Sequence, residues 1–362
     1  MSLATIAGVG SAFPQHYYDQ ETLLAALRGY WEPRYFNLDR IEQLHRNVLV
    51  GGRHLALPIE EYPALTTFGQ SNSAWIRVAE EIGGEAVVAA LGACGLAMTD
   101  VDALFFVTVT GIATPSIDAR LINRLGLRSD LKRIPIFGLG CVAGAAGIAR
   151  AADYVRGFPE EVAVLLSVEL CSLTLQRHDL SIPNLIASGL FGDGAAAAVV
   201  VGMDRAQNLP VLPSKCPPGP EIVATRSIFY PHSERVMGWD ISESGFQIVL
   251  SADVPKVVEE HLRADVDAFL GERGLARHDI ASWVCHPGGP KVLEAMAKAL
   301  ETPEGALALT WKSLREVGNL SSTSVLLVLE ATLAERRPPA GSLGMLLALG
   351  PGFCSELVLL RW

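Results

Sequence analysis

Apolar residues along the chain gather in short runs that alternate with longer stretches of helical periodicity. Runs of strand length, apolar almost throughout, occupy residues 103–109, 162–168, 195–201, 281–285 and 343–349. Such runs are typical of strands that are buried on both faces. The stretches 74–91 and 254–270 precede two of these runs and have the spacing of helices. The alternation predicts an α/β fold, with helices on the faces of buried sheets.

Segments of the two chain halves resemble each other at a nearly constant offset. Residues 95–101 parallel residues 274–280, which lie 179 positions later, and each segment separates a helical stretch from an apolar strand. Cys141 and Asn319 each follow a glycine and precede a helical stretch, 178 positions apart, and two of the strands above match at 181. Three matches in the same order predict an internal duplication in which Cys141 and Asn319 begin equivalent helices.

The duplication divides the chain into two pseudo-symmetric halves, which we expect at residues 1–205 and 206–362. The proline-rich segment 210–220 cannot continue a helix or a central strand, and it falls where the halves should join. Residues 19–73 are irregular and charged, and they resemble an insertion into the first half. In a duplicated α/β protein, we expect a site where the helix starts of the two halves converge.

Composition narrows the class of protein. Half of the 362 residues are hydrophobic and 19% are charged, compared with about 25% charged in ordinary globular proteins. Such a chain hides much of its surface in a wide sheet or in a subunit interface. The net charge of −10 argues against nucleic acid or an anionic membrane as the partner.

The beginning of the chain and its cysteines predict a cytoplasmic protein without a membrane span. The first residues lack the basic segment of a secretory signal, and no apolar run approaches the length of about 18 residues that a span requires. The cysteines are scattered, without a CxxC pair, at positions Cys94, Cys141, Cys171, Cys216, Cys285 and Cys354. This pattern predicts free and mostly buried thiols, with neither a zinc site nor a redox pair.

Cys141 stands where a glycine-rich approach meets a small-residue helix, in the sequence FGLGCVAGAAG that begins at position 137. The free N–H groups and the dipole of a helix N-terminus favour thiolate over thiol. The pattern therefore predicts a nucleophile. A buried, inert cysteine on a core helix is the alternative on this local pattern.

Three further segments carry residues of catalytic type. His286 follows an apolar strand and precedes the turn Pro-Gly-Gly-Pro. A lone histidine is more often structural, but this position, in the half opposite Cys141, favours a catalytic partner. Asn319 fits a helix N-cap and also supplies an amide donor at a helix start. Asp193 and Gly194, between two apolar runs, are predicted to form a turn.

Together these motifs resemble the type III polyketide synthases, the chalcone-synthase-like family of the thiolase fold. The resemblance is carried by Gly140-Cys141, the FGDG run that begins at Phe191, the HPGGP run that begins at His286, the GNLSS run that begins at Gly318, and Gly350-Pro351-Gly352. The motifs occur in family order over most of the chain. The HPGGP run is the most specific of them, and the resemblance is to bacterial rather than plant members.

The resemblance implies a thiolase-like five-layer α-β-α-β-α fold built from the two halves. It implies an acyltransferase that condenses an acyl-CoA starter with malonyl-CoA by iterative decarboxylative Claisen condensation on Cys141. His286 and Asn319 would complete the catalytic set, and the chain would cyclise to a pyrone, a resorcinol or a hydroxynaphthalene-type product. The resemblance further implies a homodimer that uses coenzyme A thioesters and needs no metal or organic cofactor.

The resemblance also assigns substrate-binding positions. Phe191 matches the aromatic residue at the tunnel mouth, Trp239 stands where plant enzymes have a small glycine, and Ile248 stands where they have a gatekeeping phenylalanine. The remaining positions are Cys171, Thr174, Ser321, Gly350, Pro351 and Gly352, with Arg46 and Arg53 as contacts to the coenzyme A phosphates. The bulk of Trp239 implies a small starter such as malonyl-CoA, or an acyl chain that enters another channel.

Two alternative functions are compatible with these motifs. One is a single-round β-ketoacyl synthase III-like enzyme or acyltransferase that passes the acyl group to another acceptor. The other is an inactive homologue that serves as a partner subunit, which the presence of Cys141, His286 and Asn319 disfavours.

Overall fold

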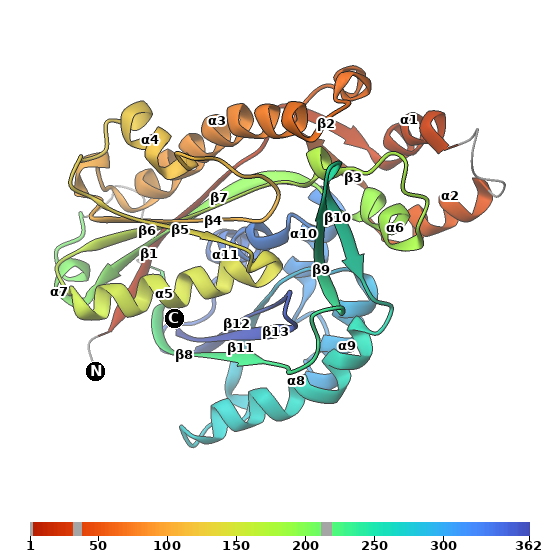
Figure 1. Ribbon diagram of the computed structural model, residues 1–362. Helices are drawn as coiled ribbons and strands as arrows, with labels where there is room; N and C mark the ends of the chain where they lie inside the picture. Colours follow the sequence, from red (N-terminus) through yellow and green to blue (C-terminus); the bar gives the residue numbers. More distant parts are fainter. Residues whose placement is uncertain (1–2, 32–37, 211–218) are drawn as a thin grey trace.

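The computed structural model describes residues 3–31, 38–210 and 219–362, so most of the proline-rich segment predicted at the junction lies outside the described residues. Five layers are stacked in Figure 1. Helices α3 (Phe68–Cys94) and α4 (Ile117–Leu125) cover the first sheet, α5 (Ala143–Gly157) and α11 (Ser324–Glu335) lie between the sheets, and α8 (Val254–Gly271) and α9 (Pro290–Leu300) cover the second. The predicted five-layer thiolase-like fold is confirmed.

The strands of both sheets form one hydrogen-bonded series. Its order is β11-β12-β13-β8-β1-β7-β6-β4-β5. The first sheet contains β1 (Ala4–Ala12), β4 (Ala103–Thr108), β5 (Lys132–Phe137), β6 (Val162–Leu170) and β7 (Asp193–Gly202). The second contains β8 (Glu221–Phe229), β11 (Ile280–Cys285), β12 (Leu343–Gly350) and β13 (Cys354–Arg361). The pairs Ala4↔Ile222 and Thr5↔Glu221 join β1 to β8 and so connect the two sheets.

The apolar runs of the sequence form strands of these sheets, as predicted. Strands β4, β6 and β7 are buried at every residue, which explains why their sequences show no polar alternation. The predicted turn at Asp193 and Gly194 is wrong, because both residues begin β7 and pair with β6. The Asp193 carboxylate accepts hydrogen bonds from the backbone N–H groups of Ala56 and Ser172, which compensates for its burial.

The two halves repeat one pattern of strand pairing. In the first half, β6 is parallel to β4 and antiparallel to β7, which is antiparallel to β1. In the second, β12 is parallel to β11 and antiparallel to β13, which is antiparallel to β8. Short 3₁₀ helices, η3 (Gly140–Val142) and η6 (Ser321–Thr323), lead into α5 and α11. This repeated arrangement supports the predicted internal duplication.

The predicted equivalence of Cys141 and Asn319 is wrong by three residues. The starts of η3 and η6, of α5 and α11, and of β6 and β12 share an offset of 181 (140 and 321, 143 and 324, 162 and 343). Cys141 therefore corresponds to Ser322. Gly140 corresponds to Ser321, and both have a left-handed backbone, with φ of 56° and 47°. Since serine rarely adopts positive φ, the sequence did not reveal this match.

Small residues let the central helices approach closely at the start of α5. A Cβ atom on Gly144 would lie 2.2 Å from the carbonyl oxygen of Ser322, and one on Gly147 would lie 2.4 Å from the Leu165 side chain. Neither position has room for a larger residue. The predicted small-residue helix therefore brings Cys141 against the second half of the protein.

Elements outside the layers gather at one end of the molecule, to the right in Figure 1. They are β2 (His16–Asp19), α1 (Gln20–Trp31), α2 (Leu38–Asn47), β3 (Gly52–Leu55), η1 (Ile59–Ala64), α6 (Ile182–Leu190) and the hairpin β9 (Met237–Ser242) and β10 (Gly245–Leu250). Most of them come from the segment predicted as an insertion. The remaining short elements are η2 (Met98–Asp100), η4 (Cys171–Thr174), α7 (Met203–Ala206), η5 (Arg277–Asp279) and α10 (Ala308–Val317).

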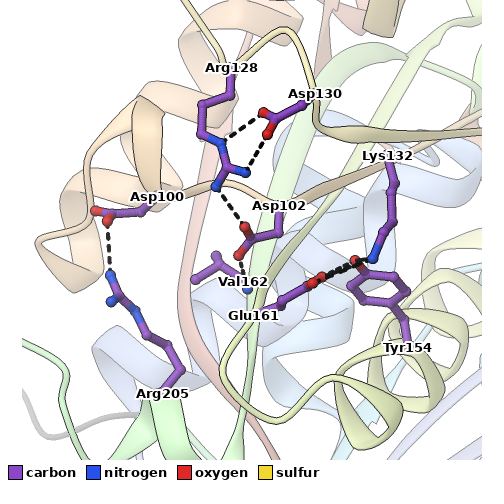
Figure 2. A network of polar contacts seen from close by, with 9 residues as sticks. All are labelled: Asp100, Asp102, Arg128, Asp130, Lys132, Tyr154, Glu161, Val162 and Arg205. Carbon is purple, nitrogen blue, oxygen red and sulfur yellow. Dashed lines mark hydrogen bonds and ion pairs between the residues drawn. The ribbon is translucent and has the colours of Figure 1, made fainter.

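A polar network fixes the strand starts of the first half, as Figure 2 shows. The Asp102 carboxylate accepts hydrogen bonds from the Val162 backbone N–H and from Arg128, both at 2.8 Å. Its own carbonyl accepts the Lys132 backbone N–H, also at 2.8 Å. Arg128 pairs in addition with Asp130 at 2.9 Å. Asp102 thus connects the beginnings of β4, β5 and β6.

We expect Asp102→Ala to lower the free energy of unfolding by about 1–3 kcal/mol, because it leaves the buried Val162 N–H without its acceptor. Urea denaturation measures the change. The matched control is Asp130→Ala, which removes a partner of the same arginine but is 70% exposed, so its effect should stay within about 0.5 kcal/mol. Equal losses in the two variants would show that the backbone contact contributes nothing.

Candidate active site

Cys141 lies in the turn η3 and is 6% exposed. A Cβ atom on the preceding Gly140 would lie 2.7 Å from the Pro351 ring, and one on Gly350 would lie 2.7 Å from the Val142 backbone nitrogen. The turn that carries Gly350 and Pro351 therefore packs directly against the turn that carries Cys141. This close contact explains why both turns are rich in glycine.

Ser321 connects the predicted nucleophile to the second half of the protein. Its Oγ lies 3.4 Å from the Cys141 Sγ. Its backbone N–H donates to the Asn319 Oδ1 at 2.8 Å. That bond stabilises the left-handed conformation of Ser321, which is unfavourable for a residue with a side chain.

His286 and Asn319 come from different loops, and these two loops contact each other through a hydrogen bond. His286 directly follows β11, and Asn319 Nδ2 donates to the carbonyl oxygen of Gly288, two residues further on, at 3.4 Å. Both side chains are buried, and His286 Nδ1 has no hydrogen-bond partner among the described residues. Contacts therefore run from Cys141 through Ser321 and Asn319 to the loop of His286. The structure brings the three predicted residues into one region.

Burial opposes an isolated charge on either the thiol or the imidazole. It raises the pKa of Cys141 to about 12, an effect that the Ser321 hydrogen bond reduces and the nearby Glu169 strengthens. It lowers the pKa of His286 to about 3. At Cys141, desolvation therefore outweighs the lowering of the pKa by the backbone at the helix start. A thiolate can form here together with an imidazolium, since the pair carries no net charge.

Glu169 is a neighbour that the sequence analysis missed. It lies fully buried in β6 and accepts hydrogen bonds from Ser322 Oγ, Thr110 Oγ1 and the Val109 backbone N–H. Burial raises the pKa of its carboxyl to about 7. A single acidic residue inside an otherwise apolar strand was the signal that could have indicated it.

A small pocket of about 20 Å³ opens at Cys141. Trp239 and Ile248 face each other across the β9–β10 hairpin and form part of its wall. Its lining residues are Val109, Gly140, Cys141, Cys171, Phe191, Met237, Gly238, Trp239, Ile248, Ser321 and Pro351. Six of the predicted substrate-binding residues thus lie beside the cysteine: Cys171, Phe191, Trp239, Ile248, Ser321 and Pro351. Among the others, Val109 and Met237 carried no sequence signal.

A second, larger cavity of about 380 Å³ lies behind this wall. Both cavities are lined by Cys171, Phe191, Trp239 and Ile248, so these four side chains separate them. The large cavity extends to apolar residues of α1 and to Tyr62 of η1, which the sequence analysis did not predict. Thr174 lines this cavity but not the small one.

Gly350 and Gly352 support the site without lining the small pocket. Gly350 contacts the Cys141 turn as described above. Gly352 has φ of 132°, and a Cβ atom there would lie 3.0 Å from the Phe229 ring. A side chain at position 352 would therefore be strained and crowded.

The two predicted coenzyme A contacts differ in exposure. The Arg46 side chain is 73% exposed and pairs with Glu42 at 3.5 Å. Arg53 is 3% exposed, and its Nη1 donates to the backbone carbonyls of Ser188 and Phe191. Because Nη1 is occupied by two backbone carbonyls and the side chain is buried, this arrangement does not favour the predicted contact of Arg53 to the coenzyme A phosphates. The sequence did not indicate that the Arg53 side chain reaches the last turn of α6.

Within residues 3–31, 38–210 and 219–362, no group of three or more histidine, cysteine or acidic side chains is placed to hold a metal ion. In the same residues, no helix has both the length and the apolarity to cross a membrane. The described cysteines Cys94, Cys141, Cys171, Cys285 and Cys354 are free thiols, as predicted; Cys216 lies outside the described residues.

Comparison with known proteins agrees with this geometry. Residues 1–205 match the N-terminal domain model of the chalcone and stilbene synthases, and residues 221–362 match the C-terminal domain model. A 1,3,6,8-tetrahydroxynaphthalene synthase from Streptomyces peucetius subsp. caesius is 50% identical over 99% of this chain and 93% of its own length. A phloroglucinol synthase from Pseudomonas fluorescens is 31% identical over 97% of both chains.

A solved structure matches the fold of this chain over nearly its whole length. The crystal structure of 1,3,6,8-tetrahydroxynaphthalene synthase from Streptomyces coelicolor superposes with a TM-score of 0.90, at 31% identity over 99% of both chains. The chain belongs to the chalcone and stilbene synthase family. It is a type III polyketide synthase, an acyl-transferring enzyme that uses coenzyme A thioesters and needs no further cofactor. The single-round alternative is not favoured by these relatives.

We expect the protonation of Cys141 and His286 to be coupled, and this expectation has a testable pH dependence. In His286→Gln the thiol has no imidazolium beside it and titrates toward its pKa of about 12, so its alkylation rate by iodoacetamide should rise about tenfold per unit between pH 7 and 9. The wild-type rate should be nearly flat over this range. Cys141→Ala identifies the reacting thiol by mass spectrometry. Parallel profiles for wild type and His286→Gln would disprove the coupling.

Proposed function

We propose that this enzyme uses malonyl-CoA both as starter and as extender, and that it forms a hydroxynaphthalene of the tetrahydroxynaphthalene type. The small pocket at Cys141 carries this proposal, because Trp239 and Ile248 leave about 20 Å³ beside the sulfur, which suits a short acyl group. The name of the 50% identical relative supports it. The ten carbons of a naphthalene correspond to five two-carbon units.

In the proposed acyl transfer, the Cys141 thiol gives its proton to His286 and attacks the thioester carbonyl of the starter. The bond from that carbonyl to the coenzyme A sulfur breaks, and the imidazolium returns the proton to the leaving thiolate. The unpartnered Nδ1 of His286 supports this role, because one ring nitrogen is available as an acceptor. The product of this step is an acyl thioester on Cys141.

In the proposed condensation, Asn319 Nδ2 and His286 donate hydrogen bonds to the thioester carbonyl of malonyl-CoA. Loss of carbon dioxide leaves an enolate on that oxygen, and one donor to such a charge contributes about 3 kcal/mol. The bond from Asn319 to Gly288 is long at 3.4 Å, so the amide can exchange it for the substrate. The enolate carbon then attacks the Cys141 thioester and the bond from that carbonyl to Sγ breaks, which releases Cys141 as thiolate. A proton taken up from solvent restores the thiol for the next cycle.

The wall between the two cavities is proposed to set how far the chain grows. Phe191, Cys171, Trp239 and Ile248 border the reacting sulfur on one side and the cavity of about 380 Å³ on the other. A cavity of this size is ordinary for a bound organic ligand. Its apolar lining supports a second candidate function, in which a longer acyl starter occupies it and the product is a pyrone or a resorcinol. Thr174 would then contact the acyl chain.

The remaining parts of the proposal concern coenzyme A, the compartment and the chain halves. Arg46 is proposed to contact the coenzyme A phosphates, which its exposure supports. A cytoplasmic location is proposed because the reaction needs Cys141 as a free thiol. The halves are proposed as residues 1–205 and 206–362, each with one thiolase-like repeat.

We also propose that two copies of this chain form a homodimer through β5. This strand is the last of its sheet, and edge strands are normally covered. Exposed apolar residues at Ile112 and Phe137 border a groove of about 560 Å³ beside it, and apolar patches of this kind mark interfaces. In a two-fold dimer the same edge would pack against itself.

The product assay tests the proposed reaction. Malonyl-CoA as sole substrate should give an aromatic product of ten carbons, detected by mass spectrometry. If the enzyme instead uses a longer acyl starter, acyl-CoA starters of increasing length should give longer pyrones or resorcinols. Cys141→Ala should lose covalent acylation but keep decarboxylation of malonyl-CoA, because His286 and Asn319 remain. Products with a single extension, or an acylated Cys141→Ala, would contradict the proposal.

Light scattering after size-exclusion chromatography tests the homodimer. We expect a mass of twice the 38.7 kDa chain for the wild type, and the monomer mass for Phe137→Asp, because a charge at the interface core is costly to bury. Ile241→Asp is the control, since Ile241 is also apolar and exposed but lies on the hairpin. A dimer that survives Phe137→Asp would exclude this face.

A further inference from the structure

We propose that Arg53 is a positioning residue for the decarboxylation step. Its buried guanidinium would hold the backbone segments of Phe191 and Asn319 in the arrangement that the step requires. This inference rests on the proposed function, in which the Asn319 amide donates to the malonyl thioester and Phe191 borders the reacting sulfur.

Arg53 binds backbone oxygens in the last turn of α6 and just beyond it. Its Nη1 donates to the carbonyl oxygen of Ser188 at 2.6 Å and to that of Phe191 at 2.9 Å. Both acceptors belong to the main chain. The arginine therefore holds the end of α6 and the backbone of Phe191 in place. These bonds do not depend on which side chains α6 carries.

The same backbone segment is bonded to Asn319. Phe191 and Asn319 form a parallel β-bridge. The Asn319 N–H donates to the Leu190 carbonyl at 2.9 Å, and the Gly192 N–H donates to the Asn319 carbonyl at 3.0 Å. A displacement of the Phe191 carbonyl would therefore move Asn319 as well, because two hydrogen bonds connect their main chains.

The arginine side chain also fills the space between the two segments. A Cβ atom on Gly192 would lie 3.5 Å from Arg53 Cβ and Cγ, and one on Gly318 would lie 3.2 Å from Arg53 Cγ and Cδ. The methylene groups of Arg53 thus contact the residue after Phe191 and the residue before Asn319. A shorter or thinner side chain would leave a void at this junction.

The charge of Arg53 strengthens these bonds. Burial lowers the pKa of the guanidinium to about 10, and the nearby Asp193 opposes this effect, so the group stays protonated at neutral pH. Hydrogen bonds from a charged donor are stronger than those from a neutral one. The Asp193 carboxylate itself accepts the backbone N–H groups of Ala56 and Ser172.

Arg53 is expected to affect the acylation and decarboxylation steps differently. Acylation depends on Cys141 and His286, to which the structure gives Arg53 no hydrogen bond. Decarboxylation depends in addition on Asn319, whose main chain is bonded to the Phe191 segment that Arg53 holds. Loss of Arg53 should therefore impair decarboxylation much more than acylation.

The experiment measures both steps on the same preparations of Arg53→Met and Arg53→Lys. Acetyl-CoA labels Cys141, and the labelled fraction from mass spectrometry counts the competent sites. Malonyl-CoA decarboxylation is then expressed per competent site. We expect the decarboxylation rate to fall about 100-fold in Arg53→Met, which is typical of a misplaced catalytic group. In Arg53→Lys we expect an intermediate fall of about tenfold, because the ammonium keeps the positive charge but not the planar set of donors of a guanidinium. The acylation rate should stay within about twofold.

Two controls complete the design. Arg263→Met replaces an arginine of α8 that pairs with Glu301 at the surface, and both rates should remain at the wild-type value. Unchanged decarboxylation per competent site in the Arg53 variants, or a proportional fall of both rates, would overturn the inference. If Arg53→Met does not accumulate as folded protein, Arg53→Lys decides by the same criterion. Asn319→Ala tests the proposed function separately, because normal decarboxylation in that variant would refute the role of Asn319 itself.

Discussion

The close approach of α5 to η6 is the constraint on which the rest of the structure depends. The carbonyl oxygen of Ser322 occupies the space that a side chain at Gly144 would need. Ser167 of β6 adds hydrogen bonds of 2.8 Å to Ser322 and Thr323. Because the two halves touch with so little between them, the turn of Cys141 lies against the loops of the second half. The active site is therefore a property of the junction between the halves, and neither half contains it alone.

The duplication explains why the site is asymmetric. Cys141 and Ser322 occupy equivalent positions at the starts of α5 and α11, but their surroundings differ. Cys141 faces the small pocket, whereas the Ser322 hydroxyl donates to the buried Glu169. One copy of the turn thus presents a reactive group to substrate, and the other copy supports the first. The catalytic asparagine proposed here lies three residues before the equivalent position, in the loop that leads into η6.

Much of the fold could be predicted from the sequence because it depends on local and periodic signals. Strands such as β6 and β7 are mostly apolar and buried at every residue, and His286 directly follows β11 as expected. The failures have a common physical cause, which is tertiary context. The positive φ of Ser321, the strand position of Asp193 and the burial of Arg53 all depend on neighbours from distant parts of the chain. The balance between helix terminus and desolvation at Cys141 likewise depends on packing that a sequence pattern does not contain.

The β9–β10 hairpin has a consequence for how such enzymes diversify. Trp239 and Ile248 are partners in a two-stranded sheet that shares no strand with the main series. Substitutions at these positions therefore leave the register of the layered core untouched. Selection can therefore alter the shape of the reaction chamber without changing how the core strands pair. One architecture can in this way evolve toward many products.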